Sequence, residues 1–352
     1  MYSVKNLHLE PTTDCNASCP QCPRNVYGSK HQPSGFVKSR FNPALLNRMD
    51  VEFDNILVNG NYGDFVMLGG GAVGLVSDLR KRWPNAAIQV NTNGSALHRR
   101  EWSLMGEWGI TIEFGIDGVD QDTHAIYRKG TLLSRVMENA QYFIDAGGNA
   151  HWAMTVFDHN KEQVDRARKL SEEMGFSKFT ARPSTRFVNG NPTPILNDDF
   201  SIRDWLWPSD NANWDFDTQR KELKVPKKFA RAHEKNMIVM RDVQAGRIED
   251  EVTCWAETHE SIYVDASGRV YPCCWMGRHD LWENVCKELD AWDGFNHLDR
   301  GVPLSGILAN EFWEKLNKSI EDNNPVKPCS VACGKCSSFN EQMDNSEVYI
   351  NE

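Results

Sequence analysis

Three cysteines near the N-terminus have a spacing that can hold an iron–sulfur cluster. Cys15, Cys19 and Cys22 form a C-x3-C-x2-C pattern in a loop that follows an apparent first strand. Cysteine thiolates are the usual ligands of such clusters. Three thiolates hold three irons of a four-iron cubane, so the fourth iron has no protein ligand. The pattern therefore predicts a [4Fe–4S] cluster whose open iron can bind a small molecule that carries an amine and a carboxylate.

Zinc binding and a disulfide are the two alternatives for these cysteines. Structural zinc takes four ligands in a tetrahedral array, and the nearest histidines, His8 and His31, lie outside the loop. A zinc site would therefore need a ligand that the fold brings in from a distance. A disulfide would leave one of the three cysteines over, and nothing else marks the chain as secreted.

A second group of cysteines lies in the last hundred residues. Residues 261–272 read as two short β runs around an Asp-Ala-Ser-Gly turn, which is typical of a hairpin. This hairpin would bring the cysteine before it close to the cysteine at its exit, and a C-x2-C pair near the end could complete a four-thiolate site. Zinc and a [4Fe–4S] cluster both accept four thiolates. The group consists of Cys254, Cys273, Cys274, Cys286, Cys329, Cys333 and Cys336.

Polar and glycine-rich turns follow the predicted strands of the N-terminal half. In parallel α/β barrels the chemistry lies at the C-terminal ends of the strands. Each turn alone is explained by the turn preference of Gly, Asn and Asp. Their order behind the cysteine pattern favours a functional site instead. The candidate residues are Gly63, Asp64, Thr92, Asn93, Asp117 and, beyond the sixth strand, Arg182, with Arg186 nearby.

Together these motifs resemble the radical S-adenosylmethionine (radical SAM) enzymes. Gly63-Asp64 is similar to that family's Gly-Gly-Glu turn, Asn91–Gly94 to its Thr-Asn-Gly turn, and Gly115–Asp120 to its Ile-Asp-Gly stretch. The resemblance implies that the open iron chelates SAM, and that the turns and Arg182 contact its ammonium, ribose or carboxylate. Two departures are evident: Asp64 replaces the usual Glu, and Gln21 replaces the aromatic residue that covers the adenine.

The C-terminal cysteines resemble the SPASM/twitch extension of the same enzymes, which holds auxiliary [4Fe–4S] clusters. The shorter twitch form, with one fully ligated cluster, fits better because the C-x2-C-x5-C run of a full SPASM domain is absent. We assign its ligands as Cys254, Cys273, Cys333 and Cys336. Cys329, and then Cys274, are the rivals for one of these places. Cys286 lies in a predicted helix over 281–292 and is expected to be a core thiol.

Alternating strand-like and helix-like segments are expected to position the N-terminal motifs. Such alternation indicates parallel βαβ units, and six units predict a partial (β/α)6 TIM-like barrel. The predicted domains are the barrel over 1–190, a bridging insert over 191–250 that is a lid or a plain linker, and the cysteine-rich domain over 251–352. Strands are predicted over 4–10, 55–59, 87–91, 110–116, 151–157 and 176–182, and helices over 44–49, 72–83, 132–146 and 161–174.

Composition limits the partners of the chain. The 352 residues are 40% hydrophobic and carry a formal net charge of −10, which disfavours general affinity for nucleic acid. No signal peptide and no apolar run of membrane-spanning length is evident, so we expect a cytoplasmic protein without a membrane partner. Ten cysteines in that compartment indicate metal or redox chemistry.

These observations predict a radical SAM oxidoreductase or modifying enzyme. SAM would be cleaved to a 5'-deoxyadenosyl radical, which abstracts hydrogen from a substrate. The resemblance implies a peptide or protein substrate, with dehydrogenation of a small molecule such as a sugar alcohol as the alternative. It also implies a reductant such as flavodoxin or ferredoxin. From another class, the chain could be an iron–sulfur electron carrier or a zinc-binding module without catalysis.

Overall fold

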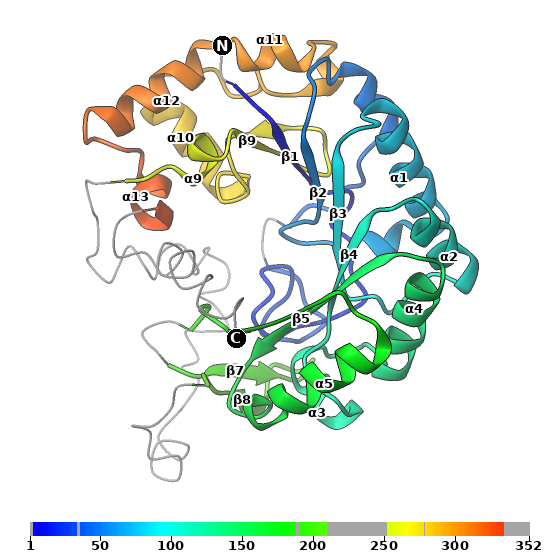
Figure 1. Cartoon of the computed structure of the whole chain (residues 1–352). Coiled ribbons are helices and arrows are strands. Elements are labelled where there is room, and N and C mark those ends of the chain that lie inside the picture. The colour runs from blue at the N-terminus through cyan, green and yellow to red at the C-terminus, as the bar shows by residue number, and fades with distance from the viewer. Residues whose placement is uncertain (1–2, 34–35, 188–190, 210–251, 278, 334–352) are drawn as a thin grey trace.

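A curved, mostly parallel sheet with helices on its outer side forms the frame of the molecule (Figure 1). The computed structural model describes residues 3–33, 36–187, 191–209, 252–277 and 279–333. The sheet has the order β10-β9-β1-β2-β3-β4-β5-β6, and only β10 runs antiparallel to its neighbour. The strands are β1 (Asn6–Leu9), β2 (Asn55–Val58), β3 (Ala87–Thr92), β4 (Thr111–Gly115), β5 (Asn149–Val156), β6 (Lys178–Pro183), β9 (Ser261–Val264) and β10 (Val270–Tyr271).

Alternating burial along the strands directs one face of the sheet to the helices. In β5, for example, Ala150, Trp152 and Met154 are buried, while the residues between them are half-buried on the other face. The helices cover the apolar face with buried stripes such as Val136, Ala140 and Phe143 of α4. The barrel helices are α1 (Gly71–Arg82), α2 (Arg99–Glu107), α3 (Gln121–Tyr127), α4 (Leu133–Asp145) and α5 (Val164–Met174), with short 3-10 turns η1 (Pro43–Arg48), η2 (Phe65–Leu68) and η3 (Lys161–Gln163).

The predicted parallel α/β architecture is confirmed, with all six predicted strands in sequence order. The first βα unit differs from the others because only the short η1 turn, rather than a full helix, lies between β1 and β2. The cysteine loop and its following segment occupy this connection. Two helices, α2 and α3, were not predicted. Among the described residues, no helix is both long enough and apolar enough to span a membrane.

The C-terminal hairpin belongs to the same sheet as the barrel strands. β9 pairs in parallel with β1, from Asn6 opposite Ser261 to Leu9 opposite Val264, and β10 folds back on β9. The predicted hairpin is therefore confirmed, and it extends the barrel sheet beyond its first strand. Helices then pack beside it (Figure 1). They are α9 (Trp255–Thr258), α10 (His279–Glu288), η5 (Leu298–Arg300), α11 (Leu304–Leu308), α12 (Glu311–Glu321) and α13 (Lys327–Cys333).

The start of the predicted insert is an antiparallel hairpin, although Pro192 and Pro194 favour a loop there. β7 (Thr193–Leu196) and β8 (Ile202–Leu206) pair antiparallel, with a register shift at Ile195 and Leu196. The hairpin forms because Ile195 and Leu206 are buried against the cysteine loop, a contact that local sequence does not reveal. The rest of the predicted insert, over residues 210–250, lies outside the described residues.

Candidate active site

The cysteine loop leaves β1 and turns sharply around Cys19. Cys15, Cys19 and Cys22 are all free thiols; Cys19 is buried and the other two are half-buried. The backbone N–H of Cys22 donates to the Cys19 oxygen at 3.0 Å, and the Asn25 side chain donates to the same oxygen at 3.1 Å.

The surroundings of Cys15 and Cys19 oppose the ionisation of these two thiols. Burial raises the pKa of Cys15, and the charge of Asp64 raises it further. Burial also raises the pKa of Cys19 to about 12, although the positive charge of Arg128 acts in the opposite direction. Cysteine must be deprotonated to bind metal, so metal binding at such a site releases protons. Ionisation of Cys15 and Cys19 is therefore favoured only when a positively charged partner lies beside them.

The donor set fits a cluster better than a single ion. Among the described residues, no three His, Cys, Asp or Glu side chains converge as one metal ion requires. A cubane binds each cysteine through a different iron, so its cysteines need not converge. Cys15 also receives N–H donors: its Sγ lies 3.7 Å from Asn93 Nδ2 and 3.4 Å from the Ala17 nitrogen. Such hydrogen bonds to sulfur tune iron–sulfur clusters.

The turns after β2 and β3 meet at Asp64, beside the cysteine loop. The Asp64 carboxylate accepts hydrogen bonds from Thr92 Oγ1 at 2.6 Å and from the Asn93 N–H at 2.7 Å, and it caps η2 through the Val66 N–H at 3.1 Å. The Asp64 N–H donates to the Asp14 oxygen at 2.8 Å. Burial raises the pKa of Asp64, and the three hydrogen bonds oppose that rise. The structure thus brings four of the predicted residues together, namely Asp64, Thr92, Asn93 and, through Asn93, Cys15.

Gly63 allows two backbone segments to approach closely. A Cβ atom at this position would lie 1.6 Å from the Thr12 oxygen, so no other residue fits without a backbone shift. The N–H groups of Tyr62 and Gly63 donate to Glu10 Oε1 at 2.8 and 3.2 Å. These contacts hold the turn after β2 against the end of β1.

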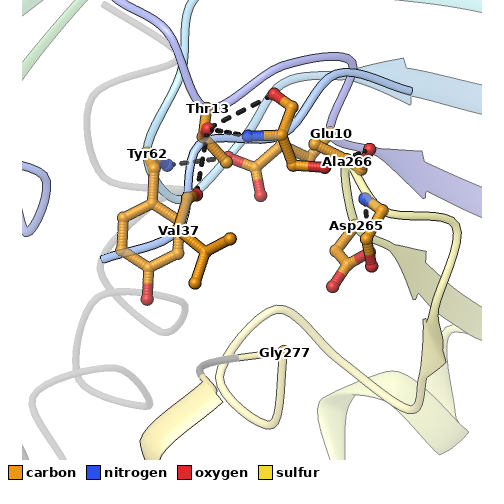
Figure 2. Close-up of a pocket in the computed structure, with 9 residues that line it drawn as sticks. Glu10, Thr13, Val37, Tyr62, Asp265, Ala266 and Gly277 are labelled. Atoms are coloured by element: carbon orange, nitrogen blue, oxygen red, sulfur yellow. Dashed lines mark hydrogen bonds between the residues drawn. The ribbon is translucent and has the colours of Figure 1, made fainter. Parts of the chain in front are cut away.

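Glu10 is a buried carboxyl that the sequence analysis missed. It is 1% exposed and accepts a hydrogen bond from the Tyr263 hydroxyl of β9. Burial raises the pKa of Glu10 to about 7, opposed by its hydrogen bonds. Glu10 borders a cavity of about 30 Å³, beside Tyr62 and Asp265 (Figure 2). The one available signal is a charged residue that directly follows an apolar strand.

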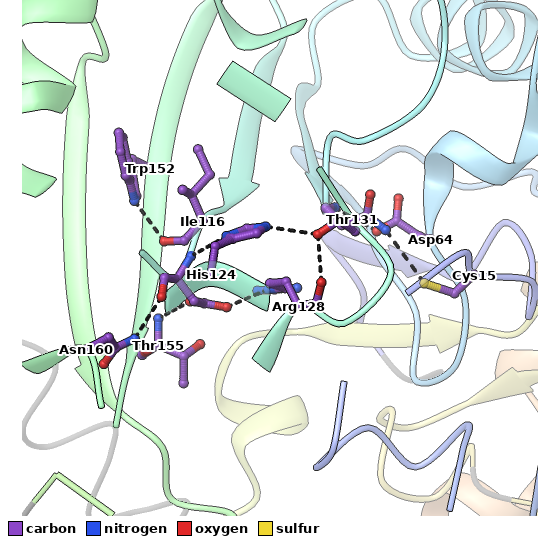
Figure 3. A network of polar contacts seen from close by, with 11 residues as sticks. Cys15, Asp64, Ile116, His124, Arg128, Thr131, Trp152, Thr155 and Asn160 are labelled. Atoms are coloured by element: carbon purple, nitrogen blue, oxygen red, sulfur yellow. Dashed lines mark hydrogen bonds and ion pairs between the residues drawn. The ribbon is translucent and has the colours of Figure 1, made fainter. Parts of the chain in front are cut away.

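Asp117 is the centre of a buried network at the ends of β4 and β5 (Figure 3). It is 0% exposed and accepts from Arg128 Nε at 2.5 Å and from the Thr155 N–H at 2.6 Å. Asn160 donates to its backbone oxygen at 3.0 Å. His124 contacts Thr131 Oγ1 at 2.9 Å, and burial lowers the pKa of His124 to about 4. Asp117 therefore has a structural partner in Arg128.

Arg128 connects this network with the cysteine loop. Burial lowers the pKa of Arg128, but the negative charges of Asp117, Cys19 and Tyr127 and the hydrogen bond to Asp117 together outweigh burial and hold that pKa above its usual range. The positive charge of Arg128 also lowers the pKa of Cys19, against the effect of burial. Gly115 makes room for the guanidinium, because a Cβ there would lie 2.3 Å from Arg128 Nη2. Sequence reasoning noticed Arg128 after the Ile-Asp-Gly stretch but gave it no role.

The structure does not bring Arg182 to this group. Arg182 is exposed near the end of β6, and within the described part of the chain it forms no ion pair with the other candidate residues. Burial raises the pKa of Glu113 of β4, and the charge of Arg182 opposes that rise. Arg186 instead donates to the Gln21 backbone oxygen at 3.2 Å. Of the two predicted arginines, only Arg186 contacts the cysteine loop.

Four C-terminal cysteines lie close to one another. Burial raises the pKa of Cys273 and Cys329, and the charges of Cys254 and Cys333 raise both pKa values further. The charge of Cys273 also raises the pKa of Cys329. Cys286 is 1% exposed in the core, as predicted for a structural thiol. Cys274, half-buried next to Cys273, also raises the pKa of Cys273, and Cys336 lies outside the described residues.

Comparison with known proteins supports the barrel. Residues 9–170 match the model of the Radical SAM superfamily, whereas no curated protein matches the chain. Among solved structures, anSMEcpe with bound AdoMet has a TM-score of 0.53 and 14% identity, covering 98% of this chain and 93% of that one. SuiB of Streptococcus suis bound to precursor peptide SuiA has a TM-score of 0.50 and 12% identity, covering 79% of this chain. The match spans 62% of SuiB.

A second anSMEcpe structure contains a peptide. It is the native protein with bound AdoMet and the Cp18Cys peptide, with a TM-score of 0.50 and 14% identity, covering 97% of this chain and 95% of that one. At such identities the likeness shows the shared fold.

Proposed function

We propose, from the radical SAM domain over residues 9–170, that this chain is an enzyme that cleaves S-adenosylmethionine reductively. Cys15, Cys19 and Cys22 would hold the [4Fe–4S] cluster. The cluster and SAM, when bound, supply a 5'-deoxyadenosyl radical that abstracts hydrogen from the substrate. The observation that carries the proposal is the meeting of Asp64, Asn93 and Cys15 at the ends of β1, β2 and β3.

Asp64 is suited to bind the ammonium group of SAM. A carboxylate has about four positions that accept hydrogen bonds. Thr92, Asn93 and Val66 fill three of them, which leaves one acceptor position on a carboxylate whose direction is fixed by these bonds. Asn93 donates its backbone N–H to this carboxylate and its side-chain amide to Cys15, so it would hold the Asp64 carboxylate in a fixed position relative to the cysteine loop. Thr92, Asn93 and Gly63 would act by holding Asp64 in place.

Arg128 is suited to bind a carboxylate, in place of the predicted Arg182. Its Nε is bonded to Asp117, which fixes the plane of the guanidinium and leaves further N–H donors on the two terminal nitrogens. Guanidinium groups bind carboxylates in a planar, two-bond arrangement. Because Arg128 acts electrostatically on Cys19, it lies on the side of the barrel where SAM would bind. Asp117 would then act through Arg128.

An auxiliary [4Fe–4S] cluster is proposed at Cys254, Cys273, Cys329 and Cys333. The electrostatic influence of Cys254 and Cys333 on both Cys273 and Cys329 supports this set. Cys274, which also acts on Cys273, and Cys336, which was assigned first and lies outside the described residues, are the rivals for the place given to Cys329. The cluster would accept an electron from the substrate radical, and a reductant such as flavodoxin or ferredoxin would supply electrons to the first cluster. Zinc also takes four thiolates, although these four do not converge as a single ion requires in this structure, and sulfide analysis distinguishes zinc from a cluster.

We favour a peptide or protein as the substrate. Two proteins of the same fold, SuiB and anSMEcpe, have been crystallised with the SuiA and Cp18Cys peptides. Their identity to this chain is 12–14%, so the support is a shared architecture that accepts peptides.

Iron and sulfide content, combined with EPR spectroscopy, tests the proposal. The protein would be reconstituted anaerobically and reduced with dithionite, with and without SAM. About eight irons per chain and a signal shifted by SAM are expected for two cubanes with one open iron. About four irons with the SAM shift would retain the radical chemistry and assign zinc, or no metal, to the C-terminal site. Absence of iron, or a signal indifferent to SAM, would refute the proposed function.

A further inference from the structure

Gln21 is buried between the second and third cysteines of the loop and is held from two sides. It is 6% exposed. Its Nε2 donates to Thr193 Oγ1 of β7 at 3.1 Å, and its Oε1 accepts from Ser184 Oγ, just after β6, at 2.6 Å. Arg186 Nη1 also donates to the Gln21 backbone oxygen at 3.2 Å. Both ends of the amide are therefore engaged by segments far away in the sequence.

The β7–β8 hairpin packs its apolar side against the same loop. Ile195 and Leu206 are buried in one small cluster with Ala17 and Cys19. The hairpin is also joined to the loop by backbone contact, since the Leu196 N–H donates to the Tyr27 oxygen at 2.8 Å. A bridge between residues 157 and 208 ties the hairpin to the end of β5 (Figure 1). The cysteine loop is thus fixed between its own strand and this hairpin.

Movement of the loop away from the hairpin would leave buried polar groups without partners. The Gln21 amide and the Thr193 hydroxyl are both buried, and a buried donor or acceptor without a partner is strongly unfavourable. The loop forms no ladder with a barrel strand between Cys15 and Cys22. Its first half is held by Asn93 and by a hydrogen bond from the Ser18 N–H to the Lys129 oxygen at 2.8 Å, and the Gln21 contacts hold its second half. Cys19 and Cys22 each lie within two residues of Gln21 and must follow it.

We infer that Gln21 is a positioning residue, clamped between Thr193 and Ser184, that fixes Cys19 and Cys22 in the spacing the proposed cluster needs. The inference rests on the proposed function, because the cluster is part of that proposal. It also explains why a polar residue precedes the third cysteine. With both ends of its amide engaged by the protein, Gln21 connects the loop to the hairpin and does not cover a ligand.

Isosteric removal of one hydroxyl tests the clamp with little change in shape. Thr193→Val removes the acceptor of the Gln21 amide, Thr193→Ser retains it, and Ser201→Ala removes a hydroxyl that bonds only within the hairpin turn. The first readout is hydrogen exchange of residues 15–30 in the apoprotein. The second is the rate of iron loss from the reconstituted protein to a ferrous chelator, together with its EPR line shape.

Thr193→Val is expected to raise the hydrogen-exchange rate of residues 15–30 and the rate of iron loss about fivefold or more, as loss of a buried hydrogen bond implies. Thr193→Ser and Ser201→Ala should stay within about twofold of the wild type. Unchanged loop exchange in Thr193→Val would overturn the clamp, and so would an equal rise in the loop and in α1, which indicates general destabilisation. If the wild type binds no iron, the proposed function fails, but the exchange measurement still decides whether the clamp exists.

Discussion

Substitution of Asp64 separates SAM binding from cluster binding, because Asp64 is proposed to bind SAM and is not a cluster ligand. Asp64→Ala should retain iron, because no cysteine is altered, and should lose the SAM-induced change in the EPR signal. Removing a charged hydrogen-bond acceptor is expected to weaken SAM binding about 10- to 100-fold. Titration of the reconstituted protein with SAM, followed by EPR, measures the loss.

A control for this variant is Asp78→Ala on α1, which removes an exposed carboxylate that pairs with Lys81 at 3.7 Å. It should bind SAM like the wild type. Equal SAM affinity of Asp64→Ala and the wild type would contradict the assigned role of Asp64. An iron–sulfur electron carrier would behave in that way, because it has no need of a SAM site.

Glu10 gives the chain a pH-dependent contribution to stability. Burial raises its pKa to about 7, whereas an unfolded chain has a Glu pKa near 4.3. Between these values the folded state binds more protons than the unfolded state, so this residue lowers the free energy of unfolding as the pH rises. The full effect is of order 3 kcal/mol between about pH 4.5 and pH 7.

Glu10→Gln removes the titrating proton and keeps an acceptor for the Tyr62 and Gly63 N–H groups. The free energy of unfolding of the wild type, relative to that of Glu10→Gln, should therefore decrease from pH 5 to pH 7. Urea denaturation of the two apoproteins at both pH values measures this difference. The difference isolates Glu10 from other titrating groups such as His124. A difference that stays constant with pH would show that Glu10 is ionised in the folded protein.

Two glycines with opposite surroundings test how the elements are packed. A Cβ at Gly63 would collide with the Thr12 backbone, whereas a Cβ at Gly74, in the exposed middle of α1, would meet nothing within 4 Å. Gly63→Ala should destabilise the protein by about 2 kcal/mol or more, since backbone has to move. Gly74→Ala should stabilise it by about 0.5–1 kcal/mol, because alanine favours a helix. Thermal unfolding of both apoproteins checks the two signs, and the same sign in both would contradict this packing.

Most of the barrel elements, though not α2 and α3, could be predicted because their signals are local. Buried residues alternate along the strands, as in β5, and recur at helical spacing in α4, so period alone identifies them. The β7–β8 hairpin could not be predicted, because Pro192 and Pro194 suggest a loop and its stability comes from the distant residues Ala17 and Cys19. Tertiary packing of this kind overrides local preference.

The residues of the candidate site also divide into those with a local sequence signal and those without one. Cys15, Cys19 and Cys22 are recognisable because they are close in sequence. Glu10 and Arg128 are recognisable only once β9 and Asp117 are placed beside them. Partners that are remote in sequence but adjacent in space leave no spacing pattern to read.

At the scale of the molecule, the C-terminal segment completes the barrel sheet. β9 pairs with β1 along four residues, and Tyr263 of β9 binds Glu10 at the base of the turn that carries Gly63. Apolar side chains of this segment, such as Phe312 of α12, belong to the same core as Leu7 and Leu9 of β1. The segment therefore contributes to the fold of the barrel independently of any metal that its cysteines bind.

A truncated chain and a cysteine variant separate these two contributions. A chain that ends at residue 251 lacks β9, so the edge of β1 and part of the core are exposed, and we expect aggregation or loss of cooperative unfolding. Full-length protein with Cys254→Ser and Cys329→Ser retains β9, so it should keep the circular dichroism of the wild type. It should bind about four irons instead of about eight. A truncated chain that is monomeric and unfolds at the wild-type temperature would show that the barrel is stable without β9. That outcome would mean that the C-terminal segment serves only to bind its metal.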